Sequence, residues 1–496
     1  MNTSTGRLVV VSNRVSDPRK VAAGGLAVAL GDALARSGGL WFGWSGKVVE
    51  DGVPGEGEVH EQRSGAVQLV TVDLCQADHD AYYAGYSNQA LWPALHYRLD
   101  LADFGAGYFA GYQRVNRLLA RKLAALLRPD DVIWVHDYHL IPLADELRML
   151  GCRQRIGFFL HVPLPPPPIL AAIPGHEWLM RSFFAYDVVG LQTRADADHF
   201  ARFVQEEAGA RALGDGAFAS LGRRVIARAF PIGIDVDEFQ RLAGSNESRQ
   251  TAAMLKKQYS NRRLLVGVDR LDYSKGLPQR FRAFRELLEK YPEHRNSATL
   301  IQIASPTRQS VHVYEDLRHE LEGLAGEING DFGELDWQPI RYLHRTWARR
   351  RLPALYQCAR VALVTPLRDG MNLVAKEYVA MQDEADPGVL VLSRFAGAAE
   401  QMRDALLVNP FDIPATAQTI QRALQMSLTE RRERQTALLE QIRQHDVHEW
   451  SRSFLEALFA VEPPAVEPPP LGDDSTADHW FPPPDPREIV RSTSAN

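Results

Sequence analysis

The amino-acid sequence predicts an α/β protein with two doubly wound domains, each built on a mostly parallel sheet. Short apolar runs alternate with amphipathic helical patterns along most of the chain, which is typical of βα units. The length of 496 residues favours more than one domain. The βα units also fall into two series. They are separated by Ala243 to Thr251, a stretch of small and polar residues that we interpret as a linker.

The bulk composition excludes several classes of protein. It is 45% hydrophobic and 24% charged, with a formal net charge of −6, so there is no general nucleic-acid footprint. The three cysteines are widely spaced, without the pattern of a disulfide framework or a zinc site. No secretory signal and no apolar run of membrane-spanning length is present. We therefore expect a cytoplasmic protein without nucleic-acid or membrane partners.

The first series begins with a buried strand over Arg7 to Ser12, a glycine loop and a helix over Ala27 to Arg36. The loop lacks the G-x-G-x-x-G spacing, which counts against a nicotinamide oxidoreductase. A long amphipathic helix is predicted over Arg114 to Leu127, whereas the region around Tyr82 and Trp92 is interpreted as loop-rich. An alternating strand is predicted at Val67 to Asp73, and further buried strands are predicted at Asp131 to Val135, Arg155 to Leu160 and Asp187 to Leu191.

The second series supplies the other sheet. Its strands are predicted at Arg263 to Val268, Ala298 to Ala304, Pro339 to Leu343, Ala362 to Thr365 and Gly388 to Leu392. A last amphipathic helix runs from about Ala437 to Leu458, and the proline-rich, acidic stretch from Glu462 predicts a disordered tail. The expected domains are 1–240 and 241–445, followed by a helix at 446–461 that packs back on the first domain and the tail at 462–496.

Polar residues follow two strands of the first domain. Asp137 and His161 each lie just beyond the carboxyl end of a buried strand, which is where α/β sheets bind ligands. His136 and His139 could be a metal pair, but their spacing is generic and no third ligand is evident. The aromatic residues of this domain could stack on sugars, although a place in the core is the more common role of such rings.

The stretch Ala362 to Glu384 predicts an anion site in the second domain. A strand leads through the loop Pro366 to Asn372 into a helix that begins at Leu373. Free backbone N–H groups and the helix dipole favour a phosphate at such a helix start. Asp369 and Glu377 are placed to bind sugar hydroxyls, which indicates a sugar nucleotide. A plain α/β crossover has the same pattern, so this stretch alone does not decide.

Cationic residues follow other predicted strands. Arg270 and Lys275 come after the strand that ends at Val268, and Arg308 follows the next one. Arg14 ends the first strand of the other domain. Arginine binds phosphate oxygens bidentately and lysine acts as a point charge. Surface ion pairs are the alternative, but four cations at strand ends of an acidic protein favour two separate phosphate subsites.

Ten segments together resemble one enzyme family, the retaining glycosyltransferases of the trehalose-6-phosphate synthase type. The resemblance extends from Arg7 to about Leu458 and leaves out only the proline-rich tail. The segments, in the order of the family, are VVVSNR, AGGL, WFGWSG, LWPALHYR, VIWVHDYHL, IGFFLHVP, PIGID, RLDYSKGLP, TPLRDGMNLVAKEY and PGVLVLSRFAGAA.

This resemblance implies a GT-B fold, in which two Rossmann-like domains face a cleft. It implies transfer of glucose from UDP-glucose to glucose 6-phosphate, which gives α,α-trehalose 6-phosphate and UDP with retention of configuration. No cofactor and no metal is expected beyond these small-molecule substrates. The family also suggests a homo-oligomer, either a dimer or a tetramer.

The resemblance also assigns roles to individual residues. Arg270 and Lys275 would hold the donor diphosphate, and together with Asp369 and His161 they form the expected catalytic set. The other expected donor ligands are Gly24, Gly25, Trp347, Leu373, Val374, Ala375, Lys376 and Glu377, with Trp347 at the nucleobase pocket and Glu377 on the ribose. The expected acceptor ligands are Arg14, Tyr83, Trp92, Asp137 and Arg308.

The implied mechanism is a front-face substitution. The spacing of the carboxylates does not identify the nucleophile and acid/base pair of a retaining glycosidase. The departing diphosphate would take the acceptor's proton, while the protein positions the substrates and stabilises charge. Asp235 and Asp237 resemble a metal-binding D-x-D motif but are interpreted as local structure. Alternatives are a related transferase with another phosphorylated acceptor, such as glycerol 3-phosphate, another donor nucleotide, or a catalytically silent regulatory subunit.

Overall fold

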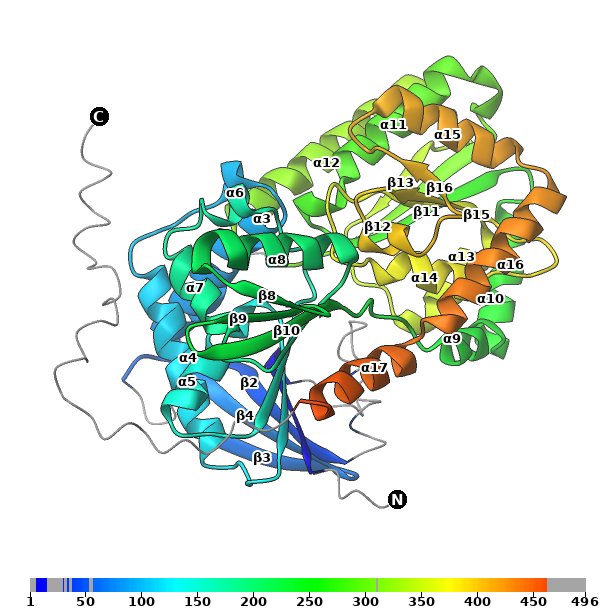
Figure 1. Ribbon diagram of the computed structural model, residues 1–496. Helices are drawn as coiled ribbons and strands as arrows, with labels where there is room; N and C mark the ends of the chain where they lie inside the picture. Colours follow the sequence, from blue (N-terminus) through cyan, green and yellow to red (C-terminus); the bar gives the residue numbers. More distant parts are fainter. Residues whose placement is uncertain are drawn as a thin grey trace, which may run out of the picture. The chain divides into compact units, whose positions relative to one another are not determined.

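The computed structural model describes residues 6–15, 30, 34, 38–52, 57–308 and 311–461 (Figure 1). They form two compact units: unit 1 contains the described residues up to Phe230 and those from Ser453 onward, and unit 2 contains Pro231–Arg452. Thus the contact-based division lies at Phe230, whereas the sequence placed the boundary at residue 240. Gly24, Gly25, most of the expected helix at 27–36 and the tail from Glu462 lie outside the described residues.

Unit 1 is built on a ten-stranded sheet with a parallel centre. The strand order is β3-β4-β2-β1-β5-β6-β7-β10-β9-β8, and all pairs from β4 to β10 are parallel. The antiparallel strands β3, β9 and β8 extend its two edges. The strands are β1 (Leu8–Arg14), β2 (Gly39–Val49), β3 (Val59–Ser64), β4 (Val67–Cys75), β5 (Val132–His136), β6 (Arg155–Phe159), β7 (Val188–Leu191), β8 (Arg211–Gly214), β9 (Ala217–Ser220) and β10 (Arg223–Ala229).

The region around Tyr82 and Trp92 in unit 1 differs from the sequence prediction. It is helical rather than loop-rich, because η1 (His79–Leu91) is a π-helix that continues into α3 (Trp92–Leu95). The other helical segments are α2 (Gln76–Asp78), η2 (Leu99–Leu101), α4 (Tyr108–Ala124), η3 (Tyr138–Leu140), α5 (Leu143–Met149), α6 (Pro167–Leu170), α7 (His176–Phe183) and α8 (Arg194–Ala208).

Unit 2 has an all-parallel sheet of six strands. The strand order is β13-β12-β11-β14-β15-β16. Strands are added to one side of β11 first and then, from β14 onward, to its other side, which is the doubly wound arrangement of nucleotide-binding folds. Together with the sheet of unit 1, it confirms the predicted fold class. The strands are β11 (Arg263–Arg270), β12 (Ala298–Ser305), β13 (Ile340–Leu343), β14 (Ala359–Val364), β15 (Val389–Ser393) and β16 (Leu406–Val408).

Helices cover both faces of this sheet, with α11 and α15 on one side and α13 and α14 on the other (Figure 1). The segments are α9 (Val236–Ala243), α10 (Asn246–Gln258), η4 (Tyr273–Lys275), α11 (Leu277–Lys290), η5 (Pro292–His294), α12 (His312–Phe332), η6 (Arg349–Arg351), α13 (Leu352–Cys358), α14 (Leu373–Ala380), η7 (Gly397–Glu400), α15 (Ile413–Gln425) and α16 (Leu428–Gln444). No helix of the described chain is both long and apolar enough to cross a membrane.

Two expectations for the second half of the chain were wrong. The stretch Ala243 to Thr251 is no linker, because it is the end of α9 and the first half of α10, which Ser245 caps. The single last helix is in fact two helices, α16 and α17 (Val447–Phe459), because Asp446 interrupts the pattern and caps α17 by accepting backbone N–H groups. In unit 1, Phe454 of α17 stacks on Trp134 with ring centroids 4.7 Å apart.

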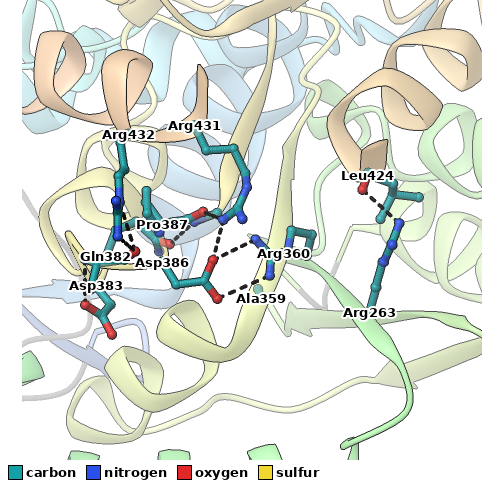
Figure 2. A network of polar contacts seen from close by, with 12 residues as sticks. Arg263, Ala359, Arg360, Gln382, Asp383, Asp386, Pro387, Leu424, Arg431 and Arg432 are labelled. Atoms are coloured by element: carbon teal, nitrogen blue, oxygen red, sulfur yellow. Dashed lines mark hydrogen bonds and ion pairs between the residues drawn. The ribbon is translucent and has the colours of Figure 1, made fainter. Parts of the chain in front are cut away.

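A polar network fixes α16 against the segment between α14 and β15 (Figure 2). The buried guanidinium of Arg431 donates to Asp386 Oδ1 at 2.6 Å and to the carbonyl of Pro387. Arg360, at the start of β14, pairs with the same carboxylate at 3.1 Å. Gln435 donates to the carbonyl of Val379 at 2.8 Å. These contacts hold the carboxyl end of α14, whose amino end points to the sheet edge described next.

Candidate active site

The carboxyl edge of the six-stranded sheet carries the donor residues that the sequence predicted in unit 2. Strand β11 ends at Arg270, and the loop Pro366 to Asn372 follows the neighbouring strand β14. Helices α11 and α14 both begin just beyond these strands. The positive ends of two helix dipoles therefore point to the topological switch point of the sheet, where open α/β sheets bind their ligands.

Lys275 and Asp369 form the centre of this edge. The ammonium of Lys275 donates to Asp369 Oδ2 at 2.5 Å, and both side chains are almost completely buried. The amide of Asn372 donates to the same oxygen at 2.9 Å. The pairing joins two residues that the sequence predicted separately, one as a phosphate ligand and one as a sugar ligand. It places a fixed cation and a fixed carboxylate side by side.

Backbone contacts hold the loop of Asp369 in place. The N–H of Leu367 donates to the carbonyl of Ser274 at 2.7 Å, next to Lys275. The N–H of Asp369 donates to Phe395 at 3.2 Å, and its carbonyl accepts from Gly397 at 3.1 Å. The cation and the carboxylate are therefore joined through their main chains as well as their side chains.

The first turn of α14 presents the other predicted donor residues. Asn372, directly before the helix, has φ = 75° and ψ = 87°, a costly conformation for a residue other than glycine that is often stored at functional sites. Leu373, Val374 and Ala375 then supply the N–H groups of the first turn, which have no partner within the helix. Glu377 lies one turn further on and is half-buried.

Lys376 is directed away from this turn. Its ammonium is fully buried and donates to the carbonyl of Ile232 at 2.8 Å and to Gln401 Oε1 at 2.7 Å. Burial lowers the pKa of Lys376 to about 7. Its side chain therefore ties α14 to Ile232 and Gln401 of the same unit, and a contact between Lys376 and the donor would come from its backbone.

Arg270 ends β11, and Arg308 follows the neighbouring strand β12, as the sequence predicted. Strand pairing places Arg270 opposite Ser305, three residues before Arg308. The guanidinium of Arg308 donates to Asp272 Oδ2 at 3.0 Å and to the Tyr314 hydroxyl at 2.8 Å. Asp272 is completely buried, so Arg308 also serves as its counter-ion within unit 2. Trp347 is half-buried in the segment after β13, where the guanidinium of Arg345 lies 5.5 Å from its ring centroid.

A second switch point lies in unit 1, between β1 and β5. Arg14 ends β1, and Asp137 follows β5. Asp137 has φ = 76° and ψ = 163°, a region that residues other than glycine rarely occupy. Its backbone N–H donates to the carbonyl of Phe159 at 2.8 Å, and its carboxylate accepts from the backbone N–H of His161 at 3.3 Å. Asp137 and His161 thus follow neighbouring strands, as the sequence predicted, and the structure adds a direct contact between them.

His161 faces a histidine that sequence reasoning did not assign to it. Its Nε2 lies 3.1 Å from Nδ1 of the fully buried His136, so one of the two nitrogens carries the shared proton. Desolvation lowers the pKa of His161 to about 3 and holds the pKa of His136 well below its usual range. Both rings are therefore neutral near pH 7, and His161 acts as a hydrogen-bonding group rather than as a cation.

The predicted acceptor residues Tyr83 and Trp92 both lie in an aromatic region of unit 1. Tyr83 packs against Trp44 with centroids 5.4 Å apart, and it stacks on His139 at 5.9 Å with an interplanar angle of 14°. Trp92 is buried and lies 4.0 Å from the ring of His96. His139 thus belongs to this aromatic group, whereas His136 faces His161, so the two are not a metal pair.

A buried arginine, Arg280, lies beneath the donor residues, and the sequence analysis did not predict it. Arg280 of α11 is completely buried and pairs with Asp269, the residue before Arg270, at 2.5 Å. It also donates to Gln302 at 2.8 Å and to Thr365, which precedes the Asp369 loop, at 3.0 Å. Arg280 therefore joins three strands at the edge that carries the site. Its helical pattern alone does not distinguish it from a surface arginine.

Two groups of possible metal ligands have structural roles. Asp235 of the D-x-D motif caps α9 by accepting the N–H of Glu238 at 2.9 Å, as the sequence interpretation expected. Among the described residues, Glu58, His60 and Asp73 also lie close enough to hold a cation. The ammonium of Lys47, however, lies 3.0 Å from Asp73 Oδ2 and already balances that charge.

Comparison with known proteins defines the class to which this fold and site belong. The family described as Glycosyltransferase family 20 matches residues 8–460. The chain therefore belongs to glycosyltransferase family 20.

The relatives and solved structures carry more particular names. A trehalose-6-phosphate synthase of Klebsiella pneumoniae is 47% identical over 463 residues, which are 93% of this chain and 97% of that protein. The structure of an alpha,alpha-trehalose-phosphate synthase (UDP-forming) from Burkholderia xenovorans in complex with glucose-6-phosphate is 48% identical, with a TM-score of 0.88. It covers 92% of this chain and 100% of that one.

A third protein is similar over the same share of both chains. It is described as trehalose-6-phosphate from E. coli bound with UDP-2-fluoro glucose, and it is 45% identical with a TM-score of 0.88. It also covers 92% of this chain and 100% of that one.

Proposed function

We propose that this chain is a retaining glucosyltransferase that transfers glucose from UDP-glucose to glucose 6-phosphate and forms α,α-trehalose 6-phosphate and UDP. The contact between Lys275 and Asp369 at the switch point of unit 2 carries the proposal, because it joins a cation suited to binding phosphate with a carboxylate suited to binding sugar hydroxyls. Family membership supports the same reaction, as do the relatives named above, one in complex with glucose-6-phosphate and one with UDP-2-fluoro glucose.

In this proposal the donor binds to unit 2. Arg270 and Lys275 contact the diphosphate, and the free N–H groups of Leu373 to Ala375 contact it from the other side. Asp369 accepts hydrogen bonds from the transferred glucose, while Glu377 binds the ribose. Trp347 lines the nucleobase pocket. Gly24 and Gly25, which lie outside the described residues, remain predicted donor ligands.

The acceptor residues complete the proposal. Arg14, Tyr83 and Arg308 bind the phosphate of the acceptor, and Trp92 and Asp137 orient its sugar. Asp137 is suited to this role because its strained backbone and its contact with His161 fix the carboxylate. His161, which stays neutral near pH 7, donates or accepts a hydrogen bond at the glucose being transferred.

The chemistry follows from these positions. The bond between the anomeric carbon of glucose and the diphosphate oxygen breaks while the acceptor hydroxyl oxygen bonds to that carbon on the same face of the sugar. The departing diphosphate oxygen takes the proton of that hydroxyl. Arg270, Lys275 and two helix amino termini stabilise the negative charge that grows on the leaving group. Positioning of both substrates supplies the remaining acceleration, so the scheme needs no protein nucleophile and no divalent metal. A cytoplasmic location and a homo-oligomeric state belong to the same proposal.

A donor-by-acceptor panel tests this function. The purified full chain is incubated with UDP-, ADP- or GDP-glucose, each with glucose 6-phosphate, glucose or glycerol 3-phosphate, and nucleotide release is followed. We expect release with UDP-glucose and glucose 6-phosphate, in the presence of EDTA as well as without it. Release with glycerol 3-phosphate alone would favour the related transferase, and no release from any pair would favour the regulatory subunit.

A further inference from the structure

The short loop within β2 contacts Arg14, which the proposed function places on the acceptor phosphate. Strand β2 bulges at this point, as the shift of its register with β4 between Trp44 and Val48 shows. Bulges of this kind occur beside functional sites, where they redirect side chains. The loop therefore lies where it can determine the orientation of the Arg14 side chain.

The Arg14 side chain packs against the backbone of Gly46, which has no side chain of its own. A Cβ at position 46 would lie 2.6 Å from Nε, 2.7 Å from Nη2 and 2.8 Å from Cζ of Arg14. These separations are far below van der Waals contact, so any side chain at position 46 must displace the guanidinium. Gly46 also has φ = 85°, a conformation that favours glycine.

The side chain of Asp73 anchors this loop through hydrogen bonds to Ser45 and Lys47. Its completely buried carboxylate accepts from the Ser45 hydroxyl at 2.6 Å and from the Lys47 ammonium at 3.0 Å. The Ser45 hydroxyl in turn accepts the backbone N–H of Lys47 at 2.9 Å. The indole of Trp44 donates to the Lys47 carbonyl at 2.9 Å. Gly46 is thus enclosed by a closed set of hydrogen bonds.

The same loop connects Arg14 with the second predicted phosphate ligand. The ring of Trp44 packs against Tyr83, with centroids 5.4 Å apart. From the other direction, the Trp41 indole donates to the Ser12 hydroxyl at 2.8 Å, and that hydroxyl donates to the carbonyl of Arg14 at 3.0 Å. The backbone of Arg14, its guanidinium and the Tyr83 ring are therefore all positioned by β2.

We propose that Gly46 and Ser45 are positioning residues for the acceptor phosphate, acting through Arg14 and held in place by Asp73. Gly46 leaves room for the Arg14 guanidinium against the backbone. Ser45 connects the loop to Asp73, because its hydroxyl donates to the Asp73 carboxylate and accepts the backbone N–H of Lys47. This inference rests on the proposed role of Arg14 as a ligand of the acceptor phosphate.

Two glycine variants separate this role from a loss of stability. Gly46→Ala introduces the clash with Arg14, whereas Gly65→Ala is the matched control: Gly65 has φ = 62° and no heavy atom within 4 Å of its Cβ position. Both substitutions strain a left-handed residue and are expected to lower the denaturation midpoint to a similar extent. Only Gly46→Ala is expected to raise the KM for glucose 6-phosphate, by about tenfold, because a charge-assisted hydrogen bond to phosphate is lost. The KM for UDP-glucose is expected to stay within about twofold.

Ser45 supplies the second comparison. Ser45→Ala is expected to raise the KM for glucose 6-phosphate, and Ser45→Thr, which keeps the hydroxyl, is expected to restore it. Equal acceptor KM values for Gly46→Ala and Gly65→Ala would overturn this inference if Arg14→Ala raises that KM. An unchanged acceptor KM in Arg14→Ala would overturn both the assignment of Arg14 and this inference. Absence of UDP release by the unmodified chain would contradict the proposed function itself.

Discussion

Removing the side chain of Arg308 is expected to have two consequences that the structure allows to be separated. Arg308 pairs with the completely buried Asp272 at 3.0 Å, and its own side chain is only 7% exposed. Loss of one partner of such a buried pair costs about 3–5 kcal/mol of unfolding free energy. If Arg308 also binds the acceptor phosphate, Arg308→Ala loses a charge-assisted hydrogen bond of about 1.5–3 kcal/mol. That loss corresponds to roughly a 10- to 150-fold rise in the KM for glucose 6-phosphate.

The double variant Asp272→Asn/Arg308→Ala distinguishes the two effects. Asparagine keeps the oxygen that accepts the N–H of Ser274 but removes the unbalanced charge, so most of the lost stability is expected to return. The acceptor KM is expected to stay high, while the donor KM remains near that of the unmodified chain. The assay is UDP release at saturating UDP-glucose with varied glucose 6-phosphate, together with urea denaturation. If the double variant recovers both stability and acceptor KM, Arg308 acts only through Asp272 and is no phosphate ligand.

The remaining predictions concern the ribose ligand and the buried histidines. Glu377→Gln is expected to raise the KM for UDP-glucose about tenfold, which is the effect of one weakened hydrogen bond. The pH profile of kcat is expected to stay unchanged, because no proton passes through Glu377. Loss of the basic or acidic limb of that profile would contradict this role. His161 has a folded-state pKa of about 3, so the unfolded chain binds its proton first and stability falls as the pH drops below about 6.5. The expected loss for this histidine is about 2 kcal/mol between pH 6.5 and 5, and His136 acts in the same direction. Urea midpoints at pH 7 and 5 measure it, and His161→Asn should have a smaller pH dependence; an unchanged difference would contradict the account.

The strands of both sheets could be predicted from the sequence because buried parallel strands are short apolar runs with clear ends. The runs at Arg263 to Val268 and Ala362 to Thr365 correspond to β11 and β14. The sequence does not contain the information that these two strands are neighbours. The pairing of Lys275 with Asp369 depends on that adjacency, so their direct contact could not be predicted from either motif alone.

The helices were harder to place, for reasons that differ between segments. The segment at 243–251 has the polar composition of a linker, but Ser245 provides a helix cap and the following residues have adequate helix propensity. The helix expected from Ala437 to Leu458 keeps its periodicity across a break that only the capping by Asp446 reveals. The π-helix around Tyr83 has a hydrogen-bond pattern for which sequence periodicity gives no signal.

The proposed reaction passes glucose from UDP-glucose to glucose 6-phosphate with retention of configuration. The most direct test incubates the full chain with both substrates, quantifies UDP and the disaccharide phosphate, and determines the linkage of the product by NMR. We expect equal amounts of UDP and disaccharide phosphate, with both anomeric centres in the α configuration and no UDP without the acceptor. A β-configured centre, or UDP release without disaccharide, would contradict it.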